Sequence, residues 1–324
     1  IQVDKVLEPS NDTGRFNLQI DSQDEITDVG NGDSTGPVNV SAGTDPPGTG
    51  ESHTVGETAF TGTDLANYDT SILCDDQTGR GSTCTDCTSL SITVLPDENV
   101  TCIVTNARKS GTLEVAKDVV PDAPGTNWNI NVNGPTPFSA TLSGDDTTGA
   151  QTAGTGDYTI VESAGSGTNL DDYATTYACT IDGETGPTGS GTSIDVSVGE
   201  GQAIVCTFTN TRKTGTLEVA KDVVPDAPST DWDINVSGPT PFSDTLTGDD
   251  TTGAQTASTG DYTIVESAGS GTSLDDYTTT YACTINSETG PTGSGTSIDV
   301  SVGEGQAIVC TFSITRKTGT LEVA

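Results

Sequence analysis

Three polar residue types, lysine, glutamate and asparagine, fall at inward positions of predicted strands, and together they could form a covalent bond. Side chains alternate between the two faces of a strand, so a residue two places after an apolar pair shares its face. Each of the three follows such a pair: Lys117 follows Leu113 and Val115, Glu162 follows Tyr158 and Ile160, and Asn210 follows Cys206 and Phe208. An earlier segment repeats the set as Lys5, Glu57 and Asn106.

An unpaired lysine or carboxylate inside an apolar core is costly, so these groups are expected to meet. One interpretation is a buried Lys–Glu ion pair with a hydrogen bond from the asparagine. A second places each residue at a strand end, where its long stem lets the polar group reach solvent. A third is an isopeptide bond: a neutral lysine amine attacks the asparagine carboxamide, while the glutamate shuttles protons and polarises the carbonyl. The candidates are Lys5, Glu57, Asn106, Lys117, Glu162 and Asn210.

The elements that must position these residues recur along the chain. Residues 110–213 return almost unchanged as 214–317, and a fixed period of this length is typical of tandem modules. Residues 1–109 are a weaker copy with an insertion at Asp75–Ser89. We therefore predict module one (1–109), module two (110–213) and module three (214–317). Residues 318–324 repeat the first strand of a module.

Each module is predicted to be all-β. Apolar and polar residues alternate around Trp128–Val132, Tyr177–Ile181 and Ile194–Val198, a period typical of half-buried strands. Turn-rich segments such as Gly144–Gly149 and Gly183–Gly191 separate them. The predicted fold is a tandem array of three Greek-key β-sandwiches of the immunoglobulin-like kind.

The eight cysteines recur at equivalent positions, which predicts disulfides and an oxidising compartment. The predicted pairs are Cys74–Cys102, Cys179–Cys206 and Cys283–Cys310, with a local pair Cys84–Cys87 in module one. A four-cysteine zinc site in module one is the alternative, since Cys84 and Cys87 have ligand spacing.

Three short motifs follow one another in order: LxVxK, then GDYTIVE with a small-residue loop, then a terminal TFTN. This order resembles that of the collagen-adhesin B-type domains, also called prealbumin-like or pilin-like domains. These occur as repeats in bacterial adhesins and pili. The resemblance implies a seven-stranded sandwich in which a first-strand lysine links to a last-strand asparagine with a glutamate catalyst. It assigns these roles to the six candidates above. Module three has Lys221 and Glu266 but carries Ile314 in place of the asparagine, so it cannot make this bond.

The net charge of −36, with 11 basic residues, argues against partners that are polyanions. Nucleic acid and anionic membranes repel such a surface. No apolar stretch is long enough to span a membrane. The chain begins on a strand pattern without a signal peptide, as a processed secreted protein would. The acidic surface suits an extracellular protein, a cation-rich milieu or a salt-loving organism alike. Together with the cysteines, it leads us to expect an extracellular or cell-surface protein that neither binds nucleic acid nor inserts into a membrane.

Other polar features favour ordinary surface roles. Paired acids are expected to be solvated turn residues, with calcium binding as the alternative: Asp145–Asp146, Asp171–Asp172, Asp249–Asp250 and Asp275–Asp276. Glycosylation sequons lie at Asn11, Asn39, Asn99 and Asn235.

His53 occupies the position of Tyr158 and Tyr262, which favours a role in its strand. Modules two and three contain no histidine, so a Ser–His or Cys–His catalytic site cannot recur there, and we predict no enzyme acting on an external substrate, no cofactor and no metal.

These observations predict a structural repeat protein, a subunit or stalk of a cell-surface fibre. The alternative is the stalk of a ligand-binding adhesin whose head domain is absent from this sequence. The expected partner is a second copy of the chain. A first-strand sequence without its module is expected to pair with a neighbouring copy's sheet, joining subunits head to tail. This donor strand consists of Gly319, Thr320, Leu321, Glu322, Val323 and Ala324. Otherwise the chain is a slice of a longer array and the strand begins a fourth module.

Overall fold

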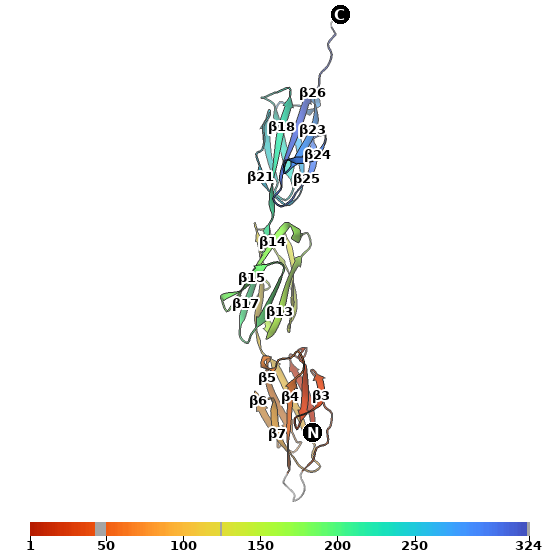
Figure 1. The fold of residues 1–324 in the computed structure, drawn as a ribbon, viewed down its shortest axis with the longest axis vertical. Coiled ribbons are helices and arrows are strands. Elements are labelled where there is room, and N and C mark those ends of the chain that lie inside the picture. The colour runs from red at the N-terminus through yellow and green to blue at the C-terminus, as the bar shows by residue number, and fades with distance from the viewer. Residues whose placement is uncertain (43–49, 124, 323–324) are drawn as a thin grey trace. The chain divides into compact units, whose positions relative to one another are not determined.

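The computed structural model describes residues 1–42, 50–123 and 125–322, and the regular structure of these residues is almost entirely β. The three modules each form a sandwich of two sheets, which confirms the predicted fold class. In Figure 1 the strands of module one run from red to orange and those of module three from green to blue. A short 3-10 turn lies directly before one strand in each module: Leu65–Asn67 before β5 (Tyr68–Asp75), Leu170–Asp172 before β14 (Tyr173–Ile181) and Leu274–Asp276 before β23 (Tyr277–Ile285).

Module one has two four-stranded sheets. The first has the order β1 (Gln2–Glu8), β8 (Thr101–Arg108), β5 (Tyr68–Asp75) and β6 (Ser82–Thr85). The second has the order β3 (Gln23–Val29), β2 (Phe16–Ile20), β4 (Glu51–Ala59) and β7 (Ser89–Val94).

Modules two and three share one topology. In module two the first sheet is β12 (Gln151–Gly154), β9 (Ser110–Val120), β17 (Ala203–Arg212), β14 (Tyr173–Ile181) and β15 (Glu184–Ser190). Its second sheet is β11 (Phe138–Ser143), β10 (Asn127–Asn133), β13 (Gly156–Ala164) and β16 (Ser193–Val198). In module three the first sheet is β21 (Gln255–Ser258), β18 (Thr214–Val224), β26 (Ala307–Arg316), β23 (Tyr277–Ile285) and β24 (Glu288–Ser294). Its second sheet is β20 (Phe242–Thr247), β19 (Asp231–Ser237), β22 (Gly260–Ala268) and β25 (Ser297–Val302).

The first and last strands of each module are neighbours in the same sheet. In module one β1 runs parallel to β8, with Lys5 opposite Val104, and in module three β18 runs parallel to β26, with Lys221 opposite Phe312. Strands far apart in sequence therefore bring the lysine and the last-strand residue to the same region of the sheet.

Alternation along the strands fills the space between the two sheets. In β10 the residues Trp128, Ile130 and Val132 are buried, and the residues between them face outward. The β14–β15 hairpin closes with Asp182 and Gly183 at φ of 54° and 82°. Two successive positive φ values are the geometry of the two-residue turns that suit the twist of a hairpin, and Asp-Gly adopts them readily.

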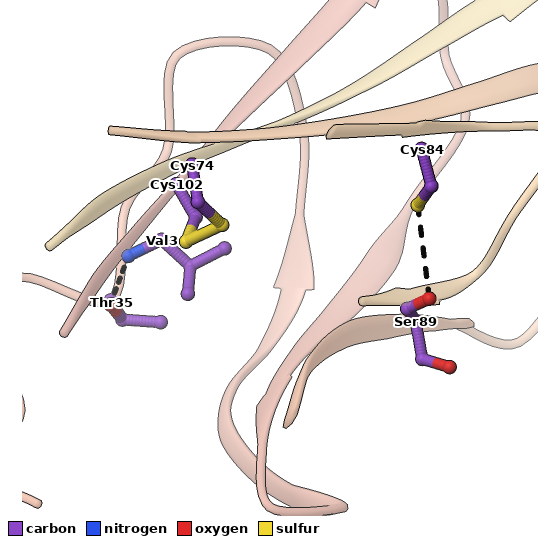
Figure 2. The surroundings of a disulfide bond; sticks show 6 residues. All are labelled: Val3, Thr35, Cys74, Cys84, Ser89 and Cys102. Atoms are coloured by element: carbon purple, nitrogen blue, oxygen red, sulfur yellow. Dashed lines mark hydrogen bonds between the residues drawn. A yellow bond between two sulfur atoms is a disulfide. The ribbon is translucent and has the colours of Figure 1, made fainter. Parts of the chain in front are cut away.

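Disulfides join neighbouring strands in every sandwich. The bonds Cys74–Cys102, Cys179–Cys206 and Cys283–Cys310 each join two buried cysteines, separated by 27 or 28 residues in the sequence. Cys84–Cys87 is the fourth bond, and no cysteine in the described residues is free. Figure 2 shows Cys74–Cys102 next to Val3 of β1, and the Cys84 sulfur directed toward the Ser89 carbonyl. These bonds take the place of the alternative zinc site.

Candidate functional site

The first candidate site lies between the two sheets of module one. Lys5 comes from β1 and Asn106 from β8 in the first sheet, whereas Glu57 comes from β4 in the second. The Lys5 Nζ lies 3.0 Å from Glu57 Oε2 and donates to Asn106 Oδ1 at 2.7 Å. The Lys5 and Glu57 side chains are both 0 % exposed. The structure thus brings together the three residues that the sequence singled out, and the lysine stem does not reach solvent.

Burial sets the electrostatics of this site. Desolvation lowers the pKa of Lys5 from its ordinary value, and the charge and hydrogen bond of Glu57 oppose that shift only in part. The Nδ2 group of Asn106 has no hydrogen-bond partner among the described residues. A neutral lysine amine is a nucleophile, and the Lys5 amine lies beside the carboxamide of Asn106.

In module two the lysine is directed differently. Lys117 Nζ donates to the carbonyl oxygens of Asp118 at 2.8 Å and Phe208 at 3.1 Å, and lies 3.5 Å from Glu162 Oε1. Desolvation again lowers the pKa of Lys117, opposed chiefly by Glu162. Asn210 lies on β17, two residues after Phe208, and is fully buried.

Module three keeps the charged pair and replaces the amide. Lys221 Nζ lies 3.0 Å from Glu266 Oε1 and donates to the Phe312 carbonyl at 2.9 Å. Desolvation lowers the pKa of Lys221 and raises that of Glu266. Ile314 is fully buried in an apolar cluster with Val223, Trp232 and Tyr277.

An aromatic ring beside each lysine amine was missed in the sequence analysis. The amine lies 4.4 Å from the ring centre of Phe16 in module one, 4.6 Å from Trp128 in module two and 5.0 Å from Trp232 in module three. The ring face attracts a cation and excludes water from the site. The signal available in the sequence was an aromatic residue at the same inward strand position in all three modules.

The predicted sequon residues lie apart from these buried clusters, whereas one of the paired acids contacts the backbone of a cluster residue. The sequon residues are solvent-exposed: Asn11, Asn39, Asn99 and Asn235. Carboxylates of the paired acids accept backbone N–H groups: Asp249 accepts that of Val223 on β18, and Asp250 accepts that of the next residue, Thr251. No group of three or more potential metal ligands occurs within the described ranges.

The predicted donor strand is described only in part. Residues 319–322 belong to no strand, and the Leu321 side chain is 90 % exposed. Val323 and Ala324 lie outside the described residues.

Among the helical segments that the structure describes, none has the length and apolar character needed to cross a membrane.

Comparison with known proteins gives a family match over most of the chain. The sequence model of a family described as a prealbumin-like fold domain matches residues 1–108, 131–212 and 237–316. No curated protein sequence matches.

Several solved structures resemble this chain at low identity. The major pilin protein T-13 from Streptococcus pyogenes is 14 % identical, with a TM-score of 0.38 over 64 % of this chain and 98 % of that one. The pilus adhesin SpaC from Lactobacillus rhamnosus GG, in an open conformation, is 12 % identical, with a TM-score of 0.34 over 81 % of this chain and 42 % of that one. The Bacillus anthracis TIE protein is also 12 % identical, with a TM-score of 0.30 over 95 % of this chain and 69 % of that one.

Proposed function

The chain belongs to the prealbumin-like fold domain family, and from that premise we propose that it is a structural extracellular repeat protein, the subunit or stalk of a cell-surface fibre. One observation carries the proposal: every module braces its first strand against its last through a buried lysine, and a disulfide ties the last strand to its other neighbour. Bracing of this kind resists separation of the two strands that connect a module to the rest of the chain. The net charge of −36 keeps such a protein soluble and unsuited to anionic partners.

We further propose that modules one and two cross-link themselves. The Lys5 amine, in its neutral form, attacks Asn106 Cγ, and a new C–N bond forms. Glu57 accepts a proton from the amine nitrogen and delivers one to the Asn106 nitrogen, whose bond to Cγ breaks. Ammonia leaves, and no oxidant or other co-reactant is needed. Lys117, Glu162 and Asn210 take the same roles in module two. The support is the 2.7 Å contact between Lys5 Nζ and Asn106 Oδ1 in a water-excluded site.

The intact mass of the purified chain is expected to fall below the sequence mass by two molecules of ammonia, after allowance for the four disulfides. Glu57→Ala should restore one of the two, because the bond in module one then lacks its proton relay. Glu266→Ala is the matched control, since module three has no amide to attack and its mass should change only by the substitution. A wild-type mass that shows no loss of ammonia contradicts the cross-links.

Assembly is proposed to run head to tail by strand addition from residues 319–324. The exposed Leu321 supports this, because burial of its apolar side chain against a neighbouring copy would remove apolar surface from water. Each described first sheet already contains its own first strand, so an added strand would pair at a sheet edge such as β15 or β24.

Negative-stain microscopy tests both the fibre and the donor strand. The full chain is expected to form long uniform fibres, whereas the chain without residues 319–324 should stay folded and unassembled. Circular dichroism of the shortened chain is the control for folding. If the shortened chain forms the same fibres, strand donation is wrong, and if native material consists of isolated rods ending in a knob, the adhesin stalk replaces the fibre subunit.

A further inference from the structure

The chain's only histidine joins two separate segments of module one. His53 lies on β4 and its side chain is 5 % exposed. Its Nδ1 lies 2.7 Å from Asp21 Oδ2, in the turn between β2 and β3, and its Nε2 lies 2.7 Å from the Ser41 carbonyl oxygen. A carboxylate and a carbonyl only accept hydrogen bonds, and a neutral imidazole has only one N–H to donate. Only the doubly protonated ring satisfies both contacts.

Modules two and three make the equivalent connection without a charge. The hydroxyl of Tyr158 donates to the Gly154 carbonyl at 2.9 Å and accepts from the Thr136 N–H at 3.1 Å. Tyr262 repeats this with Ser258 and Thr240, at the same two distances. A hydroxyl donates and accepts at once, so this connection does not depend on an added proton. Module one alone has replaced it with a group that loses its proton near neutral pH.

We propose that His53 is a pH-sensitive latch, which holds residues 38–42 against β4 while the imidazole is protonated and releases them when it loses its proton. The held segment is next to the first strand, because Val38 N–H donates to the Ile1 carbonyl at 2.8 Å. Val38, Val40 and Ala42 also pack against the core of module one. Release would weaken the packing of residues 38–42 against the core of module one and leave modules two and three unchanged.

The charges around the ring favour the protonated state. Among the described residues, the charged groups that act on His53 are Asp21 in the facing turn and Glu51 on β4. Burial lowers the pKa of His53, but the hydrogen bonds to Asp21 and Ser41 and the two carboxylate charges outweigh it, so the pKa lies above the ordinary 6.5. A group with a raised folded-state pKa contributes its stability fully below the unfolded value. That stability is lost as the pH rises through the folded value.

Nuclear magnetic resonance can follow the latch directly, since one histidine gives one ring Cε1–H signal. The signal is expected to titrate with a pKa above 6.5 in the full chain, and Asp21→Asn should lower that pKa. Amide hydrogen exchange of residues 38–42 should rise more steeply with pH than in His53→Tyr, in which the ring is replaced by the residue of the other modules. Amide exchange is itself faster at higher hydroxide concentration, and comparing wild type with His53→Tyr at the same pH cancels this dependence.

Three results decide the proposal. A histidine that titrates at or below 6.5 overturns it, and so does an exchange profile of residues 38–42 that is the same in wild type and His53→Tyr. If His53→Tyr fails to fold, Asp21→Asn provides the comparison. Release of residues 38–42 at lower pH than in wild type then supports the latch, and release at an unchanged pH overturns it.

Discussion

Replacing Ile314 by Asn should install a third cross-link and raise the stability of module three. Lys221 and Glu266 are already in place, with 3.0 Å between amine and carboxylate, and Ile314 occupies the strand position of Asn106 and Asn210. The expected mass is lower by one further ammonia beyond the substitution. A link from residue 221 to residue 314 closes a long loop, and the chain-entropy model of cross-links predicts a stabilisation of about 5 kcal/mol for it. Calorimetry should therefore show the module-three transition at higher temperature.

If no cross-link forms, Ile314→Asn should instead lower the stability of module three. Without the bond, the new amide is buried beside Val223, Trp232 and Tyr277, where an unsatisfied polar group costs about 1–3 kcal/mol. An unchanged ammonia count together with a lower transition temperature would contradict the proposed chemistry. The double variant Ile314→Asn with Glu266→Ala is the control, because it has the amide and the amine but no proton relay, and it should form no bond.

Removing the carboxylate of module three should be strongly destabilising, whereas removing both charges should not. Glu266→Ala leaves the Lys221 amine buried without its ion pair, which typically costs about 3–5 kcal/mol. The double change Lys221→Met with Glu266→Leu replaces the pair by apolar groups of similar size, and the expected change in unfolding free energy is close to zero or favourable.

Tryptophan fluorescence provides the measurement for this pair. The chain has two tryptophans, one each in modules two and three, so a Trp128→Phe background leaves Trp232 to report on module three during denaturant unfolding. Trp232 lies 5.0 Å from the Lys221 amine, close enough to follow the site itself. Equal destabilisation in the single and double variants would contradict this prediction, because the loss would then follow from removing the ion pair itself and not from leaving one buried charge unpaired.

The sequence by itself determined the features that depend on local alternation and on repetition. Period-two patterns placed Lys5, Glu57 and Asn106 on the inward faces of their strands, because side chains of a strand alternate between its two faces whatever the sheet around it. Recurrence of cysteines indicated the inter-strand disulfides, and the copy number of the repeat indicated three sandwiches. The same alignment exposed Ile314 as the departure that separates module three from the other two.

Only the tertiary structure decided which inward groups meet and how they are oriented. The lysine and the asparagine of module one share a sheet, but Glu57 comes from the opposite one, and contacts across layers depend on how the two sheets pack. Alternation left open whether the lysine stems reach solvent, and packing leaves them buried under aromatic rings. The orientation of Lys5 toward Asn106 and of Lys117 toward backbone carbonyls is decided the same way. The two partners of His53 lie on segments far from it in sequence, and no local pattern brings them together, because only the folded chain places Asp21 and Ser41 on either side of one ring.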